Sequence, residues 1–321
     1  MATAATADQR RAEELGVTVR KQRSLWRDAL WRLMRNRAAI VGMIVIGVAA
    51  FVALFAGVLA PYDPVRDQNT PKALMEPIWT KAFGSKFTDP GYILGSDALG
   101  RDILSRLMYA ARISLVVGFV PVSLVFLIGA TIGMVSGYVG GWVDNLLMRF
   151  TDIVYAFPDL LFLVIIVATL RGTAFGEILG GLVLIFVALA IISWVGLARL
   201  VRGQVLSLKH REFVEAARCI GVPPIRIMTR HLFPNILAPV IVSVAFAIPG
   251  AMLAEATLSF LGIGIRPPTP TWGGMINEGF VVFSTTPWPV LLPALCISTV
   301  LLAFTFVGDG LRDALDPRMK I

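Results

Sequence analysis

Long runs without a charged residue limit the folds open to this chain more than any other feature of its sequence. The first run, from Ala38 to Ala60, has no Asp, Glu, Lys or Arg in 23 residues. A helix rises about 1.5 Å per residue, so this run can cross the roughly 30 Å hydrocarbon core of a membrane. Several such runs, in a chain that is 56% apolar and 16% charged, would leave a soluble fold without a polar surface. The sequence therefore predicts an all-α polytopic membrane protein.

Five more runs bring the expected number of transmembrane helices to six. Two of these runs contain an acidic residue, Asp159 in the third span and Glu255 in the fifth. Nine Lys and Arg residues precede the first span and predict a cytoplasmic N-terminus. An even number of spans then returns the C-terminus to the cytoplasm. The later spans are expected at 113–143, 153–170, 178–198, 236–265 and 290–308.

This topology divides the chain into five parts. The first 23 residues are polar and are expected to be disordered or loosely helical. From Ser24, a predicted N-cap, apolar residues occupy one half of a helical wheel. We expect an amphipathic helix on the cytoplasmic leaflet, with a basic segment that merely flanks the first span as the alternative. The parts are a cytoplasmic N-terminal segment with this interfacial helix (1–37), the first transmembrane helix (38–60), an extracytoplasmic loop region (61–112), a five-helix transmembrane core including a cytoplasmic loop at 199–235 (113–308) and a cytoplasmic tail (309–321).

Local signals mark the end of the extracytoplasmic loop and the second span. A turn around Gly95 and Gly100 precedes a helix that is expected from about Asp102, with Asp97 or Ser96 as its cap. Within the second span, glycines recur every four residues and predict that this helix approaches a neighbour closely. These are Gly129, Gly133 and Gly137.

The cytoplasmic loop 199–235 carries seven Lys and Arg residues and has a pattern of its own. A helix is expected from about His210 to a C-terminal cap at Gly221, and Pro223 and Pro224 suit the first turn of a second helix. The small Ala216 and Ala217 would leave room for a partner. The arginines of this loop could pair with acidic groups or with phospholipid, so a docking projection and a lipid-binding loop both remain open. They are Arg211, Arg218, Arg226 and Arg230.

Several other classes of protein fit the sequence poorly. Cys219 and Cys296 lie in a loop and in an apolar run, and are not expected to form a disulfide. The two histidines, His210 and His231, lack nearby ligands at metal-site spacing, so no metal is expected. There is no phosphate-binding glycine loop, which predicts no ATP hydrolysis by this chain. The net charge of +8 lies at the ends of apolar runs, as membrane topology requires, and does not indicate nucleic acid.

Spaced motifs along the chain resemble a known family. EAARCIG and RHLFPN in the basic loop resemble the cytoplasmic signature of the membrane subunits of bacterial ABC importers. RNRAAIVG, LAPYDP, LGSDALGRDILSRLMYAARISL, LSFLGIGIRPPTPTWGGM and GDGLRDALDPR resemble the C-type inner-membrane permease of the dipeptide, oligopeptide and nickel importers. The resemblance extends from about Arg35 to the end of the chain. Ala110 departs from the pattern at a position where glycine is common.

The resemblance implies a type I ABC importer permease in the bacterial inner membrane, most simply one for di- or oligopeptides. Nickel chelates, glutathione or another small solute are alternatives within the family, and a secondary transporter is an alternative of another class. The implied partners are a homologous second permease in a heterodimer, two cytoplasmic ATPases that bind ATP and Mg, an extracytoplasmic substrate-binding protein and membrane lipid, with no nucleic acid and no cofactor in this chain itself. The implied ATPase-coupling residues are Arg211, Glu212, Glu215, Ala216, Ala217, Arg218 and Gly221.

Three acidic residues in or near the spans are candidates for a polar or gating role. For Glu255, an outer gate or a contact to a peptide amino terminus is one interpretation, and a structural hydrogen bond to a neighbouring helix is the interpretation we favour. Asp152 is expected to pair with Arg149, three residues earlier on the same helix face. Asp159, at the third span, completes the set.

Overall fold

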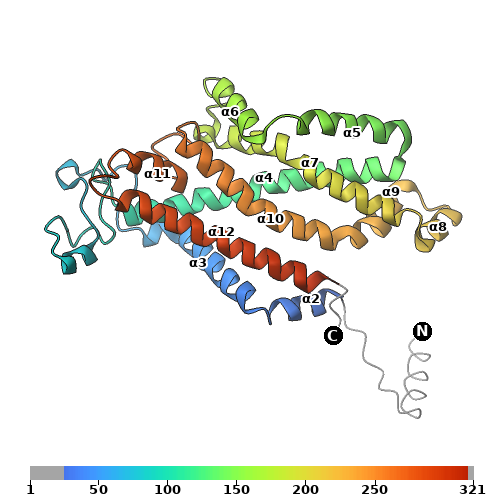
Figure 1. The fold of residues 1–321 in the computed structure, drawn as a ribbon, viewed down its shortest axis with the longest axis horizontal. Coiled ribbons are helices and arrows are strands. Elements are labelled where there is room, and N and C mark those ends of the chain that lie inside the picture. Colours follow the sequence, from blue (N-terminus) through green and yellow to red (C-terminus); the bar gives the residue numbers. More distant parts are fainter. Residues whose placement is uncertain (1–24, 317–321) are drawn as a thin grey trace, which may run out of the picture.

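The helices follow the uncharged runs, and most of them extend beyond these runs. The computed structural model describes residues 25–316, where it is helical with only isolated β-bridges (Figure 1). Five helices are long and apolar enough to cross a membrane, and a bent pair of helices makes a sixth span if it is counted as one. The five are α3 (Arg37–Leu59), α4 (Ile103–Val139), α7 (Leu182–Leu208), α10 (Phe233–Phe260) and α12 (Trp288–Leu315).

The uncharged runs mark the part of each helix that is apolar, but hydrogen bonds and caps decide where the helix ends. Helix α4 begins ten residues before its uncharged run because the Asp102 carboxylate accepts hydrogen bonds from the backbone N–H and the hydroxyl of Ser105, at 2.7 and 2.6 Å. The expected cap at Asp97 or Ser96 is therefore wrong. At the other end of the chain, α12 continues past Gly308 to Leu315, so the first residues of the expected tail are helical.

The expected third span is two helices rather than one. Helix α5 (Gly141–Tyr155) and α6 (Asp159–Leu170) meet at an angle of 81°. Pro158 lies at the break. Its ring disfavours helical geometry at Phe157, and it has no N–H to donate to the preceding turn. A single straight helix through 153–170 is therefore not what the sequence forms.

A row of glycines brings α4 into backbone contact with α7, as the spacing of these residues predicts. A Cβ atom built on Gly129 would lie 2.9 Å from the carbonyl oxygen of Trp194, and one built on Gly133 would clash with the carbonyl oxygen of Ala198. One built on Gly137 would lie 2.8 Å from the Cβ of Val205. Only glycine permits this separation, so the two helices fit closely along most of their shared length.

Helix α2 (Leu25–Leu33) packs against the end of α12, where Ala29 and Leu33 are buried together with Ala314. Trp31 on its other side is half exposed, and the guanidinium of Arg35 lies 4.5 Å from the centre of the Trp31 ring. The amphipathic helix that the sequence predicts is therefore present, and its place on a lipid surface stays a prediction. The expected cap at Ser24, the N-terminal segment before it and residues 317–321 lie outside the described residues.

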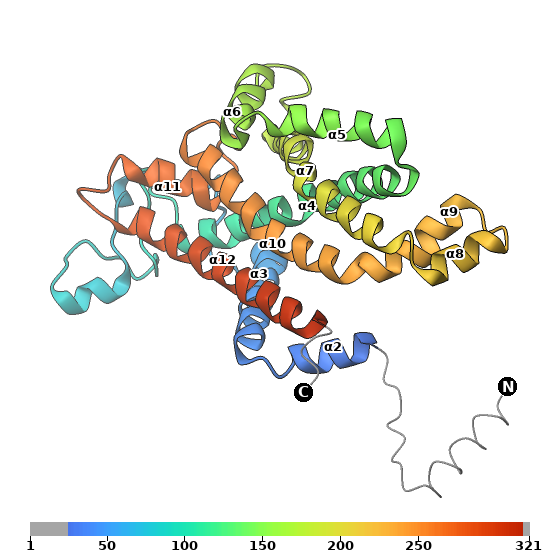
Figure 2. The same ribbon diagram turned by 45° about the vertical axis from the view of Figure 1, so that its right-hand side comes forward.

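The two ends of the helical bundle differ in what they carry. Helices α8 (Glu212–Cys219) and α9 (Pro224–Arg226) project beyond the bundle at one end, and α2 and the end of α12 lie toward the same end (Figures 1 and 2). The opposite end carries the segment between α3 and α4 and the short helix α11 (Trp272–Phe280) (Figure 1). The segment between α3 and α4 contains two 3₁₀ helices, η1 (Thr70–Lys72) and η2 (Ile78–Phe83).

Candidate functional site

The projection formed by α8 and α9 is a sharp corner built around Gly221. Helix α8 ends in a Schellman motif, because the N–H of Gly221 donates to Arg218 O and the N–H of Val222 donates to Ala217 O, both at 3.0 Å. Gly221 has φ +77°, a conformation that side chains with a Cβ rarely adopt. Pro224 then occupies the first turn of α9. The corner that the sequence predicts, with its glycine and its proline, is therefore present.

The second arm of the corner is not a separate helix. After α9 the chain forms a π-helix, η4 (Ile227–Leu232), and continues directly into α10, in which Phe233 N donates to Met228 O. Pro234 explains the π geometry, since a proline in a regular α-helix clashes with the carbonyl four residues earlier. The expected start of the fifth span at Ile236 is therefore an interior position of a longer helix.

Helix α8 has one buried face and one exposed face, and the sequence predicts the wrong face for Ala217. Val214 and Ala217 are buried, and Ala217 retains only 4% of its accessible surface because it packs in the same cluster as Val201 and Val205 of α7. The expectation that Ala216 and Ala217 together open a contact face is thus wrong for Ala217, which points inward. The exposed face has mixed polar and apolar character and is formed by Arg211, Glu212, Phe213, Glu215, Ala216, Arg218, Cys219 and Ile220.

Side chains around α8 attach the corner to the end of α4. The Arg218 guanidinium lies 5.3 Å from the centre of the Tyr138 ring, and Lys209 Nζ donates to Gly137 O at 3.1 Å. The four arginines Arg211, Arg218, Arg226 and Arg230 are all exposed, and Arg218 also contacts α4. A displacement of α8 would be passed to α7, in whose apolar cluster its buried face packs, and to α4, whose Tyr138 contacts Arg218.

Asp152 of the bent pair faces an arginine of α7, and Asp159 does not. Asp152 pairs with Arg199 at 2.8 Å, and Arg199 also lies 4.3 Å from the centre of the Tyr155 ring. The expected pair with Arg149 on the same helix is therefore wrong. Arg199 of α7 takes that place, and its position is also stabilised by the contact with the Tyr155 ring. Asp159 is exposed in the first turn of α6, where a carboxylate complements the helix dipole.

A stronger attachment, which sequence reasoning missed, lies one helix turn along α7. Arg202 donates to both carboxylate oxygens of Asp144 at 2.6 Å, and Ser136 donates to the same carboxylate. We call the two hydrogen bonds from Arg202 to Asp144 the fork. Together with the bond from Ser136, the fork connects α7, α5 and α4.

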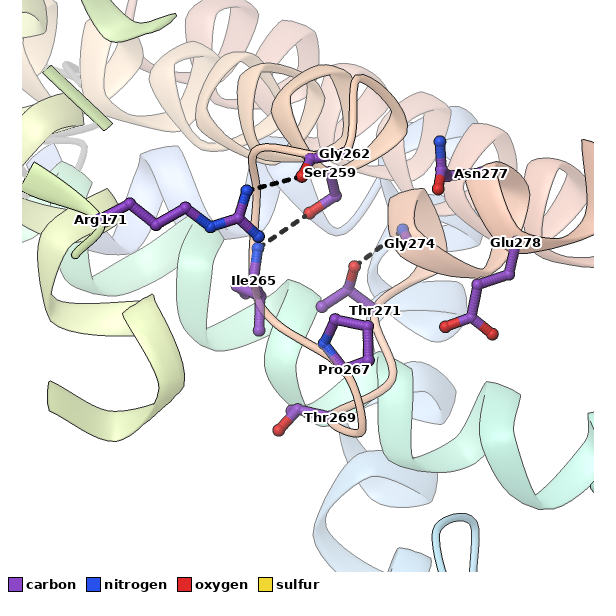
Figure 3. Close-up of a pocket in the computed structure, with 10 residues that line it drawn as sticks. All are labelled: Arg171, Ser259, Gly262, Ile265, Pro267, Thr269, Thr271, Gly274, Asn277 and Glu278. Atoms are coloured by element: carbon purple, nitrogen blue, oxygen red, sulfur yellow. Dashed lines mark hydrogen bonds between the residues drawn. The ribbon is translucent and has the colours of Figure 1, made fainter. Parts of the chain in front are cut away.

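Glu255 is fully buried in α10. Its Oε1 accepts a hydrogen bond from Ser259 of the same helix at 2.6 Å, and its Oε2 has no hydrogen-bond partner among the described residues. The favoured interpretation placed the bond on a neighbouring helix, and the bond that forms is within α10. Ser259, the partner of this carboxyl, lines a cavity of about 90 Å³ beside the loop that joins α10 to α11. In Figure 3, Arg171 reaches this loop and donates to the carbonyl of Gly262, at 2.8 Å.

The end of the bundle opposite α8 holds a buried ionic cluster that the sequence did not suggest. Asp97 Oδ2 accepts from Arg101 at 2.7 Å and from Arg106 at 2.6 Å. Glu278 Oε2 of α11 pairs with the same two arginines, at 2.5 and 2.9 Å. Arg106 is only 2% exposed, while the side chain of Glu278 is 31% exposed. We call Asp97, Arg101, Arg106 and Glu278 the ionic cluster. A signal was present in SDALGRDILSR, where acids and arginines sit between apolar residues, but Glu278 lies 177 positions after Arg101 and no local pattern connects them.

Comparison with known proteins shows which proteins this chain is similar to. The family described as binding-protein-dependent transport system inner membrane component matches residues 129–321, and the N-terminal TM domain of oligopeptide transport permease C matches residues 24–77. The chain is 40% identical to the oligopeptide transport system permease protein OppC of Haemophilus influenzae, over 92% of this chain and 89% of that protein. It is 39% identical to the dipeptide permease protein DppC of the same organism, over 89% and 92%. OppC of Escherichia coli is also 39% identical, over 92% of each chain.

The fold has a counterpart among solved structures. A chain of the MetNI methionine ABC transporter, in an inward-facing conformation, superimposes with a TM-score of 0.52 at 17% identity, over 66% of this chain and 96% of that one. At this identity the likeness concerns the fold alone, which is that of a type I ABC importer permease. Together with the apolar helices, these matches make the protein a multi-pass inner-membrane protein. The chain therefore belongs to the family of binding-protein-dependent transport system inner membrane components.

Proposed function

We propose that this chain is the permease subunit of an ATP-driven importer of di- or oligopeptides, that it forms half of the translocation pathway, and that its 210–234 corner docks on a cytoplasmic ATPase. The observation that carries the proposal is the identity of about 40% to permeases named for oligopeptides and dipeptides over about nine tenths of the chain. Its partners would be a homologous second permease, two ATPases and an extracytoplasmic substrate-binding protein. ATP and Mg would be bound by the ATPases.

The geometry of the corner suits a docking role. Its exposed face combines Glu212 and Glu215 with the apolar Phe213 and Ile220, and Ile220 retains 81% of its surface. Its inner face is packed on α7. A rigid projection with an exposed mixed surface can convert closure of an ATPase dimer into movement of the spans, whereas a mobile loop would absorb it. To move the complex from about 1% to about 99% in one state, nucleotide must favour that state by roughly 5.5 kcal/mol.

Reconstitution tests the proposal directly. The complex is purified through a tag on this chain, placed in vesicles with ATP inside, and supplied with binding protein and a labelled peptide outside. We expect co-purification of two ATPase subunits and a second permease, and peptide uptake that requires ATP. Glu215→Lys is expected to abolish uptake while the chain stays in the membrane, because it reverses a charge on the exposed face of α8. Uptake that survives this change would remove the docking role of Glu215.

The alternatives give different outcomes in the same vesicles. Accumulation of nickel chelates or glutathione in place of peptides would keep the importer and change its cargo. Uptake by this chain alone, driven by a proton gradient, would replace the importer with a secondary transporter.

Glu255→Gln addresses the remaining intramembrane candidate. The amide keeps the side-chain volume and can still accept from Ser259. Unchanged uptake would assign Glu255 a structural role, and lost uptake at normal abundance would assign it to the gate.

A further inference from the structure

Helix α4 extends from one end of the molecule to the other and has charged or polar attachments at both ends. At its C-terminal end, Gly137 and Tyr138 contact Lys209 and Arg218, beside and within α8. At its N-terminal end, Arg106 belongs to the ionic cluster. A movement imposed at α8 therefore reaches Arg106 if α4 moves as a rigid element.

Backbone contact with α7 makes α4 rigid in this sense. Over residues 129–137 the backbone of α4 lies against backbone atoms of α7 and against the side chains of Leu197, Val201 and Val205, so neither helix can slide past the other without clashes. The fork from Arg202 to Asp144 adds a directional attachment near the α8 end.

At the opposite end, α11 is in close contact with three helices. A Cβ atom built on Gly273 would lie 2.6 Å from the backbone of Ala256 in α10, and one built on Gly279 would lie 2.9 Å from Pro289 in α12. Trp272 donates through its indole N–H to the carbonyl of Leu107 in α4 at 3.3 Å. Displacement of α11 therefore displaces the adjoining ends of α10 and α12.

Ionic contacts join the loop before α4 to α11, beside an apolar cluster that α4 and α11 share. A cavity of about 350 Å³ lies beside the ionic cluster and is lined by all four of its members. Packing is therefore incomplete here, and Glu278 is held on this side by its two arginines. Arg106 is only 2% exposed, so separating it from its carboxylate partners would leave its charge unpaired away from water, and this favours a fixed geometry.

We propose that Arg106 and Glu278 are positioning residues of the transport cycle. Their ion pair carries the displacement of α4, which is imposed at α8, to α11 and so to the ends of α10 and α12. The end of the pathway that faces the binding protein then opens and closes in step with the ATPases. This inference rests on the proposed importer function and adds the route by which its two ends are coupled.

The test is the double variant Arg106→Gln/Glu278→Gln. It removes one charge of each sign, so Asp97 and Arg101 keep each other as partners. The matched control is Lys72→Met/Asp89→Asn, which removes a partly exposed ion pair of 2.7 Å from the segment between α3 and α4. Each variant is reconstituted as the whole complex with ATPases and binding protein. Peptide uptake and ATP hydrolysis are measured per assembled complex.

We expect uptake by the double variant to fall by about tenfold while ATP hydrolysis stays within about twofold of the unchanged complex, because the corner still engages the ATPases. The control is expected to keep both activities. If the double variant keeps its uptake, or loses uptake and hydrolysis in equal proportion, the inference is wrong.

A second variant covers the case in which the double variant does not assemble. Glu278→Gln alone changes the most exposed member of the cluster and is judged by the same ratio of uptake to hydrolysis. If the unchanged complex itself transports no peptide, the proposed function fails instead, so the two failures are separate.

Discussion

Gly133→Ala should weaken the contact between α4 and α7 by an amount that the structure allows us to estimate. The added methyl would meet the carbonyl oxygen of Ala198, and it would lie 2.8 Å from the Cβ of Val201 and 3.0 Å from the backbone N of Arg202. Two of these three contacts are backbone atoms, which cannot rotate away. The helices must separate by several tenths of an ångström, and overpacking of this kind costs about 1–3 kcal/mol.

Gly196→Ala is the matched control for this substitution. Gly196 lies in α7, and a Cβ atom built on it meets nothing within 4 Å. This change should leave the free energy of unfolding unaltered or raise it slightly, because alanine favours a helix over glycine by up to about 1 kcal/mol.

The measurement is equilibrium unfolding of the purified complex in mixed micelles, followed by helix content. Gly129→Ala and Gly137→Ala should behave like Gly133→Ala, since the added Cβ also meets a carbonyl oxygen, that of Trp194 at 2.9 Å and that of Arg202 at 3.0 Å. A Gly133→Ala variant as stable as Gly196→Ala would show that α4 and α7 are not in backbone contact, and the rigid pair would have to be abandoned.

The other predictions concern the corner, the α5 attachment and the segment between α3 and α4. Gly221→Val forces a β-branched residue to φ +77°, at a cost of at least about 1–2 kcal/mol, and should abolish uptake per complex while the chain stays inserted. Arg202→Gln leaves the carboxylate of Asp144 without its fork, and should lower the free energy of unfolding by about 1–3 kcal/mol in micelles; addition of Asp144→Asn should restore part of the loss. The hydrogen bond from Lys72 holds the pKa of the Asp89 carboxyl below its ordinary value of 3.8. The stability that this pair contributes is therefore present above pH 3.8 and is lost as pH falls through the lowered pKa. Protease cleavage of the segment between α3 and α4 at decreasing pH would detect this loss. A cleavage rate that stays constant through that range would contradict it.

The sequence predicted those parts of the fold that depend on local composition. Uncharged runs gave the positions of the long helices, because a span must avoid charge over most of its length. Gly221 and Pro224 gave the corner, since one permits left-handed backbone and the other starts a helix. The predicted helix ends were less accurate, because α4 and α10 continue into polar sequence where their backbone groups find hydrogen-bond partners.

Features that depend on distant residues were not predictable in the same way. Asp152 had an arginine at helical spacing, but its partner comes from α7, 47 positions later. The inward direction of Ala217 depends on how α8 rests against Val201 and Val205. The break between α5 and α6 had a clear local signal in Pro158. An apolar run alone therefore does not establish a straight span.

The π-helical turn at 227–232 has a mechanical consequence. Because Pro234 is accommodated there without a break, the helix is continuous from α9 to the end of α10, with Pro239 and Pro249 inside it. Helix α8 lies beside this axis, beyond Gly221 and in contact with η4. A force applied to α8 therefore acts as a torque on α10, and α10 can respond by turning about its own length as well as by tilting.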